Sequence, residues 1–240
     1  MIMEAHIGIG IKGKEGTQAV RSADYSISQF KFLQRVLMVH GRLGYIRISQ
    51  MICYYFYKNV ILVFTEIYFA FVNGFSGQIF FLDWLSTLYN AFFTSWTCLF
   101  AYLLEKDIND EFIQKYPKVY QAGQVGAYFS YGKFWKWMFQ AIFHGIVTYF
   151  MVMKPNSENP WTDSGRSLNH WLSSTIIFTL IIHLVMIKLF VETNYWNMMS
   201  ILAAIFSLII YYVVIALGSF NGVAVVFQNE VSGAMKGMLQ

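Results

Sequence analysis

The sequence predicts an all-α, multi-pass membrane bundle with five spans, preceded by a small α/β segment. Three observations predict this fold. Of the 240 residues, 57% are hydrophobic and only 12% are charged, whereas a soluble domain usually has about a quarter charged residues. The mean hydropathy is +0.46. The apolar residues also gather into five runs that are long enough for a helix to cross a bilayer.

Each apolar run is about 20 residues long, and Trp and Tyr mark several of the ends, as they do at membrane interfaces. Seven Lys and Arg residues precede the first run, four lie in the second loop (residues 105–133), and none lies in the first loop (residues 73–84). The N-terminus and second loop are therefore expected in the cytosol. The C-terminal end is then external or lumenal, so residues 218–240 indicate that a further span is missing. The predicted spans are residues 51–72, 85–104, 134–153, 172–191 and 196–216.

The segment before the first span has two parts. Residues 6–11 and 25–27 have the pattern of short strands and residues 14–23 that of a short helix, an α/β arrangement too small to fold alone. The glycines at 8, 10 and 13 match a dinucleotide fingerprint in spacing, but neither the apolar helix nor the acidic residue of that motif follows, so a turn is favoured. Residues 29–50 predict a helix that continues into the first span, the alternative being a helix that docks on the membrane surface.

Lys58 is the most informative polar residue because it lies near the middle of the first span, with Asn59 beside it. Even lenient scales put the cost of a lysine there at about 3 kcal/mol, so it needs water, a partner or a polar ligand. On the second span, Ser86, Asn90, Thr94 and Thr97 are spaced to share one helical face. They predict either hydrogen bonds between helices or a polar path that Asn59 faces.

The other ionisable residues within the spans are interpreted structurally. His144 and His183 lie mid-span without Cys, Asp or Glu at ligand spacing, so contacts between helices are favoured and no metal site is predicted. Lys136 and Lys188 lie near span ends and are expected to extend toward the interface. The acidic residues after the second span are expected to form a solvated cluster: Glu105, Asp107, Asp110 and Glu111.

Several stretches resemble the phospholipid-translocating (type IV, lipid flippase) subfamily of P-type ATPases. The match is specific through Gln124 and more general beyond it, where Tyr195-Trp196 is the best landmark. The stretches that carry the resemblance are Glu4-Ala5-His6-Ile7-Gly8-Ile9-Gly10, Val39-His40-Gly41-Arg42, Tyr57-Lys58-Asn59, Asn73-Gly74-Phe75-Ser76-Gly77-Gln78 and Leu88-Tyr89-Asn90-Ala91-Phe92-Phe93-Thr94-Ser95.

This resemblance implies that residues 1–28 are the C-terminal end of a phosphorylation domain, residues 29–50 a cytosolic stalk helix and residues 51–240 a transmembrane domain. It implies a pump that uses ATP and Mg²⁺ to move a phospholipid from the outer to the cytosolic leaflet, with a two-span accessory subunit and no nucleic-acid partner. The family's Asp-Lys-Thr-Gly and Gly-Asp-Gly-x-Asn-Asp motifs are absent from this chain. The chain alone is therefore expected to be inactive, with no catalytic or metal-binding residue.

The residues predicted for the substrate pathway are Lys58, Asn59, Asn90 and Thr94. Three roles stay open for Lys58: a direct phosphate contact, a built-in countercharge or a tether between helices. Trp96-Thr97 stands where the family has a proline-containing pair, so unwinding of the second span lacks its usual cause.

One alternative function is a cation-transporting P-type ATPase, although Glu66 is the one carboxylate within the first two spans and cations need several. The other is a non-catalytic multi-span membrane protein.

Overall fold

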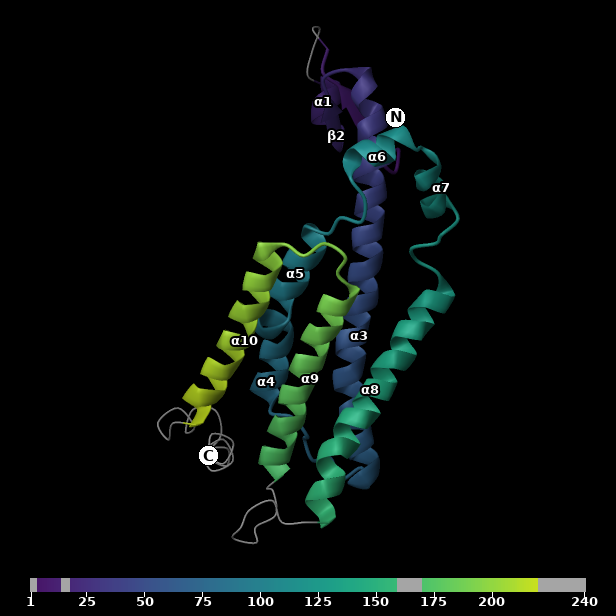
Figure 1. Ribbon diagram of the computed structural model, residues 1–240. Coiled ribbons are helices and arrows are strands. Elements are labelled where there is room, and N and C mark those ends of the chain that lie inside the picture. The colour runs from purple at the N-terminus through teal and green to yellow at the C-terminus, as the bar shows by residue number, and fades with distance from the viewer. Residues whose placement is uncertain (1–3, 14–17, 159–169, 220–240) are drawn as a thin grey trace. The chain divides into compact units, whose positions relative to one another are not determined.

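The computed structural model describes residues 4–13, 18–158 and 170–219 (Figure 1). The chain divides into two compact units, and we describe each by itself. The first unit comprises Met1–Ser49 and Lys106–Phe129, and the second comprises Gln50–Glu105 and Ser130–Gln240. Residues 220–240 of the C-terminal stretch and residues 159–169 of the third loop lie outside the described residues.

The first unit begins with a small parallel sheet. Strand β1 (Ile9–Ile11) pairs with β2 (Tyr25–Ile27), and the short helix α1 (Gln18–Arg21) lies between them in the sequence. Ile9 stands opposite Tyr25, and Ile11 stands opposite Ile27. The carboxylate of Asp24 accepts a hydrogen bond from the backbone N–H of Gly8 at 2.8 Å. The predicted order of strand, helix and strand is thus confirmed.

Helical backbone runs from Phe30 to Val72, but its period changes along the way. A 3-10 turn, η1 (Phe30–Phe32), leads through α2 (Leu33–Arg35) into a π-helix, η2 (Val36–Gly41), and then into α3 (Arg42–Val72). The second loop is also helical, with α6 (Asp110–Lys115) and α7 (Lys118–Gln124). Val39, Leu43 and Ile113 form the small buried core of the first unit.

The second unit is built from helices around an aromatic core. Besides α3 from Gln50 onward, it contains α4 (Asp83–Leu88), the π-helix η3 (Tyr89–Phe93), α5 (Ser95–Leu103), α8 (Tyr131–Glu158), α9 (His170–Glu192) and α10 (Met198–Ser219). Helix α10 packs beside α5, and α9 packs beside α8 (Figure 1). Fully buried tyrosines are prominent in this core: Tyr54, Tyr57, Tyr89 and Tyr211.

Among the described residues, three helices are long and apolar enough to cross a membrane. They are Phe30–Val72, His170–Glu192 and Met198–Leu217, which match the first, fourth and fifth predicted spans. The second predicted span is divided into α4, η3 and α5 instead of forming one helix. The third lies within the 28-residue helix α8, which is long enough but does not reach the hydropathy of the other three. The structure therefore shows three candidate spans where the sequence predicted five.

Candidate functional site

Lys58 is completely buried in the second unit, with 0% of its surface exposed. Its ammonium Nζ donates a hydrogen bond to Oγ1 of Thr94 at 2.9 Å. The same nitrogen lies 4.2 Å from the ring centroid of Tyr55 and 5.9 Å from that of Tyr89. Aromatic rings attract a cation through their quadrupole, most strongly where water is excluded. The described residues thus offer this charge a hydroxyl and two ring faces, and no carboxylate forms an ion pair with it among them.

Thr94 lies where the second predicted span breaks. Its backbone dihedrals, φ −129° and ψ −18°, are not helical, and they separate η3 from α5. The Thr94 hydroxyl donates to the carbonyl of Tyr89 at 2.7 Å, and the hydroxyls of Ser95 and Ser207 donate to the carbonyls of Asn90 and Phe93. Carbonyls released from a helix inside a membrane must find new donors. Side-chain hydroxyls supply them here, so the span unwinds without a proline.

The π-helix also corrects the predicted polar face of this span. Asn90 is exposed, Ser86 is half-buried, and Thr94 and Thr97 are buried. The prediction that all four share one face assumed a regular period of 3.6 residues, whereas a π-helix holds an extra residue in its turn. The structure therefore brings Lys58 and Thr94 together and places Asn90 on a different side of the span. Asn59 is half-buried on α3.

The two mid-span histidines link helices, as expected. His144 on α8 has its Nδ1 2.6 Å from the hydroxyl oxygen of Tyr57 on α3. His183 on α9 has its Nε2 3.1 Å from the hydroxyl oxygen of Tyr212 on α10. In both pairs the donor depends on the imidazole tautomer.

Lys188, which the sequence predicts to extend toward an interface, contacts both its own helix and α8. Its side chain is only 12% exposed, and its Nζ donates to Glu192 at 2.6 Å and to Oε1 of Gln140 at 3.1 Å. The charge also lies 4.5 Å from the ring centroid of Trp137. This lysine has a carboxylate partner on its own helix and a polar partner on α8, which makes the inward position tolerable.

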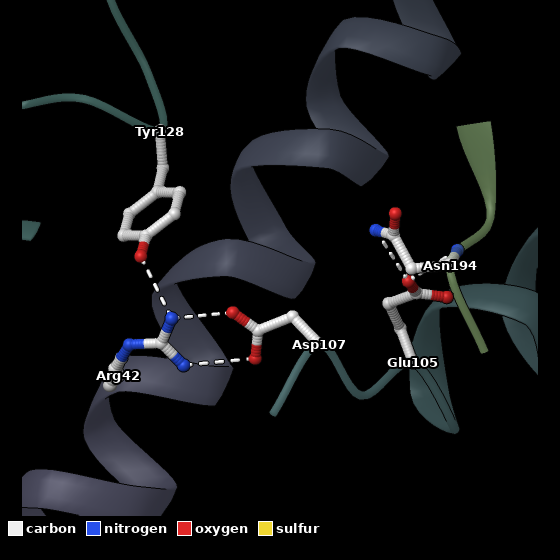
Figure 2. A network of polar contacts seen from close by, with 5 residues as sticks. All are labelled: Arg42, Glu105, Asp107, Tyr128 and Asn194. Carbon is white, nitrogen blue, oxygen red and sulfur yellow. Dashed lines mark hydrogen bonds and ion pairs between the residues drawn. The ribbon is translucent and has the colours of Figure 1, made fainter. Parts of the chain in front are cut away.

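In the first unit, the Arg42 guanidinium lies between a carboxylate and a tyrosine (Figure 2). It forms a bidentate ion pair with Asp107, with one N–O distance of 2.9 Å, and donates to the Tyr128 hydroxyl at 2.8 Å. Burial would raise the pKa of the Asp107 carboxyl, but the hydrogen bonds and charge of Arg42 outweigh burial and leave this pKa below its ordinary value. The pair thus stabilises the fold above pH of about 3.9 and loses its effect as the pH falls through the lowered pKa.

In the second unit, Glu105 is 1% exposed and contacts the turn before α10 (Figure 2). Its Oε1 accepts hydrogen bonds from the backbone N–H of Asn194 at 2.8 Å and from the Asn194 side-chain amide at 3.0 Å. The predicted solvated acidic cluster is therefore wrong for Glu105, which is buried, whereas Asp107 is exposed and forms an ion pair. Their partners lie 89 and 65 residues away in the sequence, so local spacing gave no signal of either contact.

A family model described as "Phospholipid-translocating P-type ATPase C-terminal" matches residues 20–240 of this chain. The chain belongs to this family. It is thus identified as a type IV P-type ATPase C-terminal region, in agreement with the resemblance of its stalk and first two predicted spans. Together with the apolar helices, this membership makes the chain an integral membrane protein.

Phospholipid-transporting ATPases from fungi and animals are similar over most of this chain. The relatives include C887.12 of Schizosaccharomyces pombe, 34% identical over 97% of this chain, and DRS2 of Saccharomyces cerevisiae, 36% identical over 85%. A third is phospholipid-transporting ATPase 11C of Mus musculus, 39% identical over 82% of this chain. The chain spans only 18%, 15% and 17% of the lengths of these relatives, respectively.

Membership of the P-type ATPases implies ATP and Mg²⁺, and the chain's residues do not fit a site for either. Neither the Asp-Lys-Thr-Gly nor the Gly-Asp-Gly-x-Asn-Asp motif occurs in the 240 residues. Among the described residues, no group of three or more His, Cys, Asp or Glu side chains is placed to hold a metal ion. We therefore assign no step of ATP chemistry to this chain.

Proposed function

We propose that this chain is the C-terminal membrane portion of an ATP-driven flippase that moves a phospholipid from the outer to the cytosolic leaflet. ATP and Mg²⁺ would bind to parts of the pump outside this chain, and the chain alone would not hydrolyse ATP. Its N-terminus would lie in the cytosol and its C-terminal end outside, with the divided second span and α8 completing five spans. A two-span accessory subunit would meet the external loops.

The observation that carries this proposal is the completely buried ammonium of Lys58. Its one hydrogen bond, to Thr94, leaves two of its three N–H groups without a hydrogen-bond partner among the described residues. A buried cation lacking an anion is costly, and the phosphate of a phospholipid supplies that anion. In this proposal Lys58 provides the positive charge that the lipid phosphate meets. The Thr94 hydroxyl accepts a hydrogen bond from this ammonium between transport events.

The cation-transporting alternative finds less support in the same helices. Glu66, the one carboxylate within the first two predicted spans, lines a pocket of about 450 Å³ together with Asp83, Asn73 and Gln78. It lies eight residues from Lys58, about 12 Å along a helix, and forms no ion pair with it among the described residues. The buried charge at the centre of α3 is positive, which repels a cation and attracts a phosphate.

A chimaera tests the proposed function directly. The chain would replace the matching segment of DRS2, and ATP hydrolysis would be measured in detergent with phosphatidylserine, phosphatidylethanolamine or phosphatidylcholine added. We expect at least one of these lipids to stimulate hydrolysis. A chimaera that purifies as a single folded species but responds to none of the three lipids would contradict the proposal.

Asn90 provides a second test because its amide is exposed on η3, one turn from the buried Thr94. We propose that this amide and that of Asn59 bind the headgroup where it passes the break in the span. Replacing Asn90 by Ala in the chimaera is expected to change the order in which the three lipids stimulate ATP hydrolysis. The control is Thr87→Ala, since the exposed Thr87 hydroxyl already donates to the carbonyl of Asp83. An unchanged rate and an unchanged lipid order for Asn90→Ala would remove this residue from the path.

A further inference from the structure

Tyr57 and Lys58 are neighbours on α3 that contact different helices. Both side chains are completely buried. The Tyr57 hydroxyl oxygen lies 2.6 Å from Nδ1 of His144 on α8, while the Lys58 ammonium lies 2.9 Å from the Thr94 hydroxyl. Consecutive residues of an α-helix point about 100° apart around the axis. These two hydrogen bonds therefore hold the same turn of α3 from two sides.

A third hydrogen bond fixes the backbone of this turn. The hydroxyl of Tyr89 on η3 donates to the carbonyl oxygen of Lys58 at 2.9 Å. Two of the three bonds at this turn thus come from the second predicted span. The third, between Tyr57 and His144, comes from α8.

Helix α8 packs closely against α3 beside the hydrogen bond between Tyr57 and His144. The ring of Tyr57 meets those of Trp137 and His144 edge-on, with centroid distances of 5.9 and 5.8 Å. Next to His144, a Cβ added at Gly145 would lie 3.4 Å from both the carbonyl oxygen of Ile61 and Oγ1 of Thr65. The backbones of α3 and α8 therefore approach closely beside the hydrogen bond, as small residues allow in membrane bundles.

We propose that His144 is a positioning residue, which acts through Tyr57 to hold the ammonium of Lys58 in the orientation that a lipid phosphate meets. This inference rests on the proposed function, because it takes the role of Lys58 in lipid binding as given. It adds a contribution from α8, a helix that carries none of the four residues predicted for the pathway. His144 itself touches no lipid in this proposal.

The test measures the phospholipid concentration that gives half-maximal ATP hydrolysis by the chimaera. Tyr57→Phe and His144→Leu are each expected to raise it about fivefold, the factor that corresponds to one hydrogen bond of about 1 kcal/mol. The maximal rate is expected to stay within about twofold of the parent rate. His144→Asn is expected to restore the parent value, because the side-chain oxygen of Asn can stand where Nδ1 of His stands. Combining Tyr57→Phe with His144→Leu should add nothing to either change, since both remove the same bond.

Tyr68→Phe is the matched control. The Tyr68 hydroxyl also crosses from α3 to α8, donating to the carbonyl of Ile142 at 3.3 Å, but it lies ten residues from Lys58. If Tyr57→Phe and Tyr68→Phe have the same effect, His144 serves packing alone and the inference is wrong. Lys58→Met is measured in parallel. If Lys58→Met leaves the half-maximal concentration unchanged, the proposed function of Lys58 fails, whereas an effect of Lys58→Met without one of Tyr57→Phe overturns the inference alone.

Discussion

Replacing Lys58 by Met is expected to raise the phospholipid concentration for half-maximal ATP hydrolysis by about tenfold or more. A hydrogen bond to a charged group contributes about 1.5–3 kcal/mol, and each 1.4 kcal/mol is a factor of about ten in affinity. Met retains the apolar stem and most of the length of Lys, so the side chain still fills most of the space between Tyr55 and Thr94 while its charge is gone. The measurement is lipid-stimulated ATP hydrolysis by the chimaera with DRS2, titrated with the phospholipid that stimulates it best.

Lys188→Met is the control for this substitution because it also removes a buried lysine charge from the second unit. Lys188 already has a carboxylate partner in Glu192, so it has little positive charge to offer a lipid. We expect it to affect thermal stability and to leave the half-maximal lipid concentration within about twofold, a difference under 1 kcal/mol. A loss of maximal rate in Lys58→Met with an unchanged half-maximal concentration would identify Lys58 as a tether between helices and contradict its role in lipid binding.

The sequence predicted the buried lysine but only part of its surroundings. Lys58 could be placed because its depth depends on helix rise and bilayer thickness, which are the same in most proteins. Its contact with Thr94 is consistent with the predicted polar face of the second span. The position of Asn90 was wrong because a π-helix changes the helical period, and apolar spacing alone does not reveal it. The hydroxyls of Thr94 and Ser95, which satisfy the carbonyls of that turn, were the available signal.

Long-range pairing explains the other errors. Asp107 and Glu105 follow one another closely in a charged stretch, which is typical of a solvated loop. The ion pair of Asp107 depends on Arg42 and the burial of Glu105 on Asn194, and neither partner is near in the sequence. The contact of Lys188 with Gln140 could not be predicted for the same reason, since Gln140 belongs to another helix. The composition of a segment predicts how much of it is buried. Whether a single charged side chain is buried depends on which partner the fold brings to it.

Arg42 gives the largest expected effect on stability. Replacing it by Met leaves the Asp107 carboxylate in a partly buried position without its bidentate partner, and it removes the donor to Tyr128. Breaking a buried ion pair from one side costs about 3–5 kcal/mol, and less where one partner is partly exposed, as Asp107 is here. We expect the Arg42→Met chimaera to lose structure at a markedly lower temperature than the parent, as measured by the loss of the monodisperse species after heating. Hydrogen exchange should accelerate first in residues 107–128, which contain both partners of Arg42.

Two further variants test whether Arg42 stabilises the first unit through its ion pair with Asp107 or through its positive charge alone. Arg35 also pairs with an aspartate of the first unit, Asp110, but its side chain is 57% exposed and the distance is 3.5 Å. Such surface pairs contribute about 0–1 kcal/mol, so Arg35→Met should leave the melting temperature nearly unchanged. In the double variant Arg42→Met with Asp107→Leu, no carboxylate is left unpaired. Because most of the cost of Arg42→Met comes from that carboxylate, the double variant is expected to be more stable than the single one. Equal losses in the single and double variants would show instead that Arg42 stabilises the first unit through Tyr128 and packing.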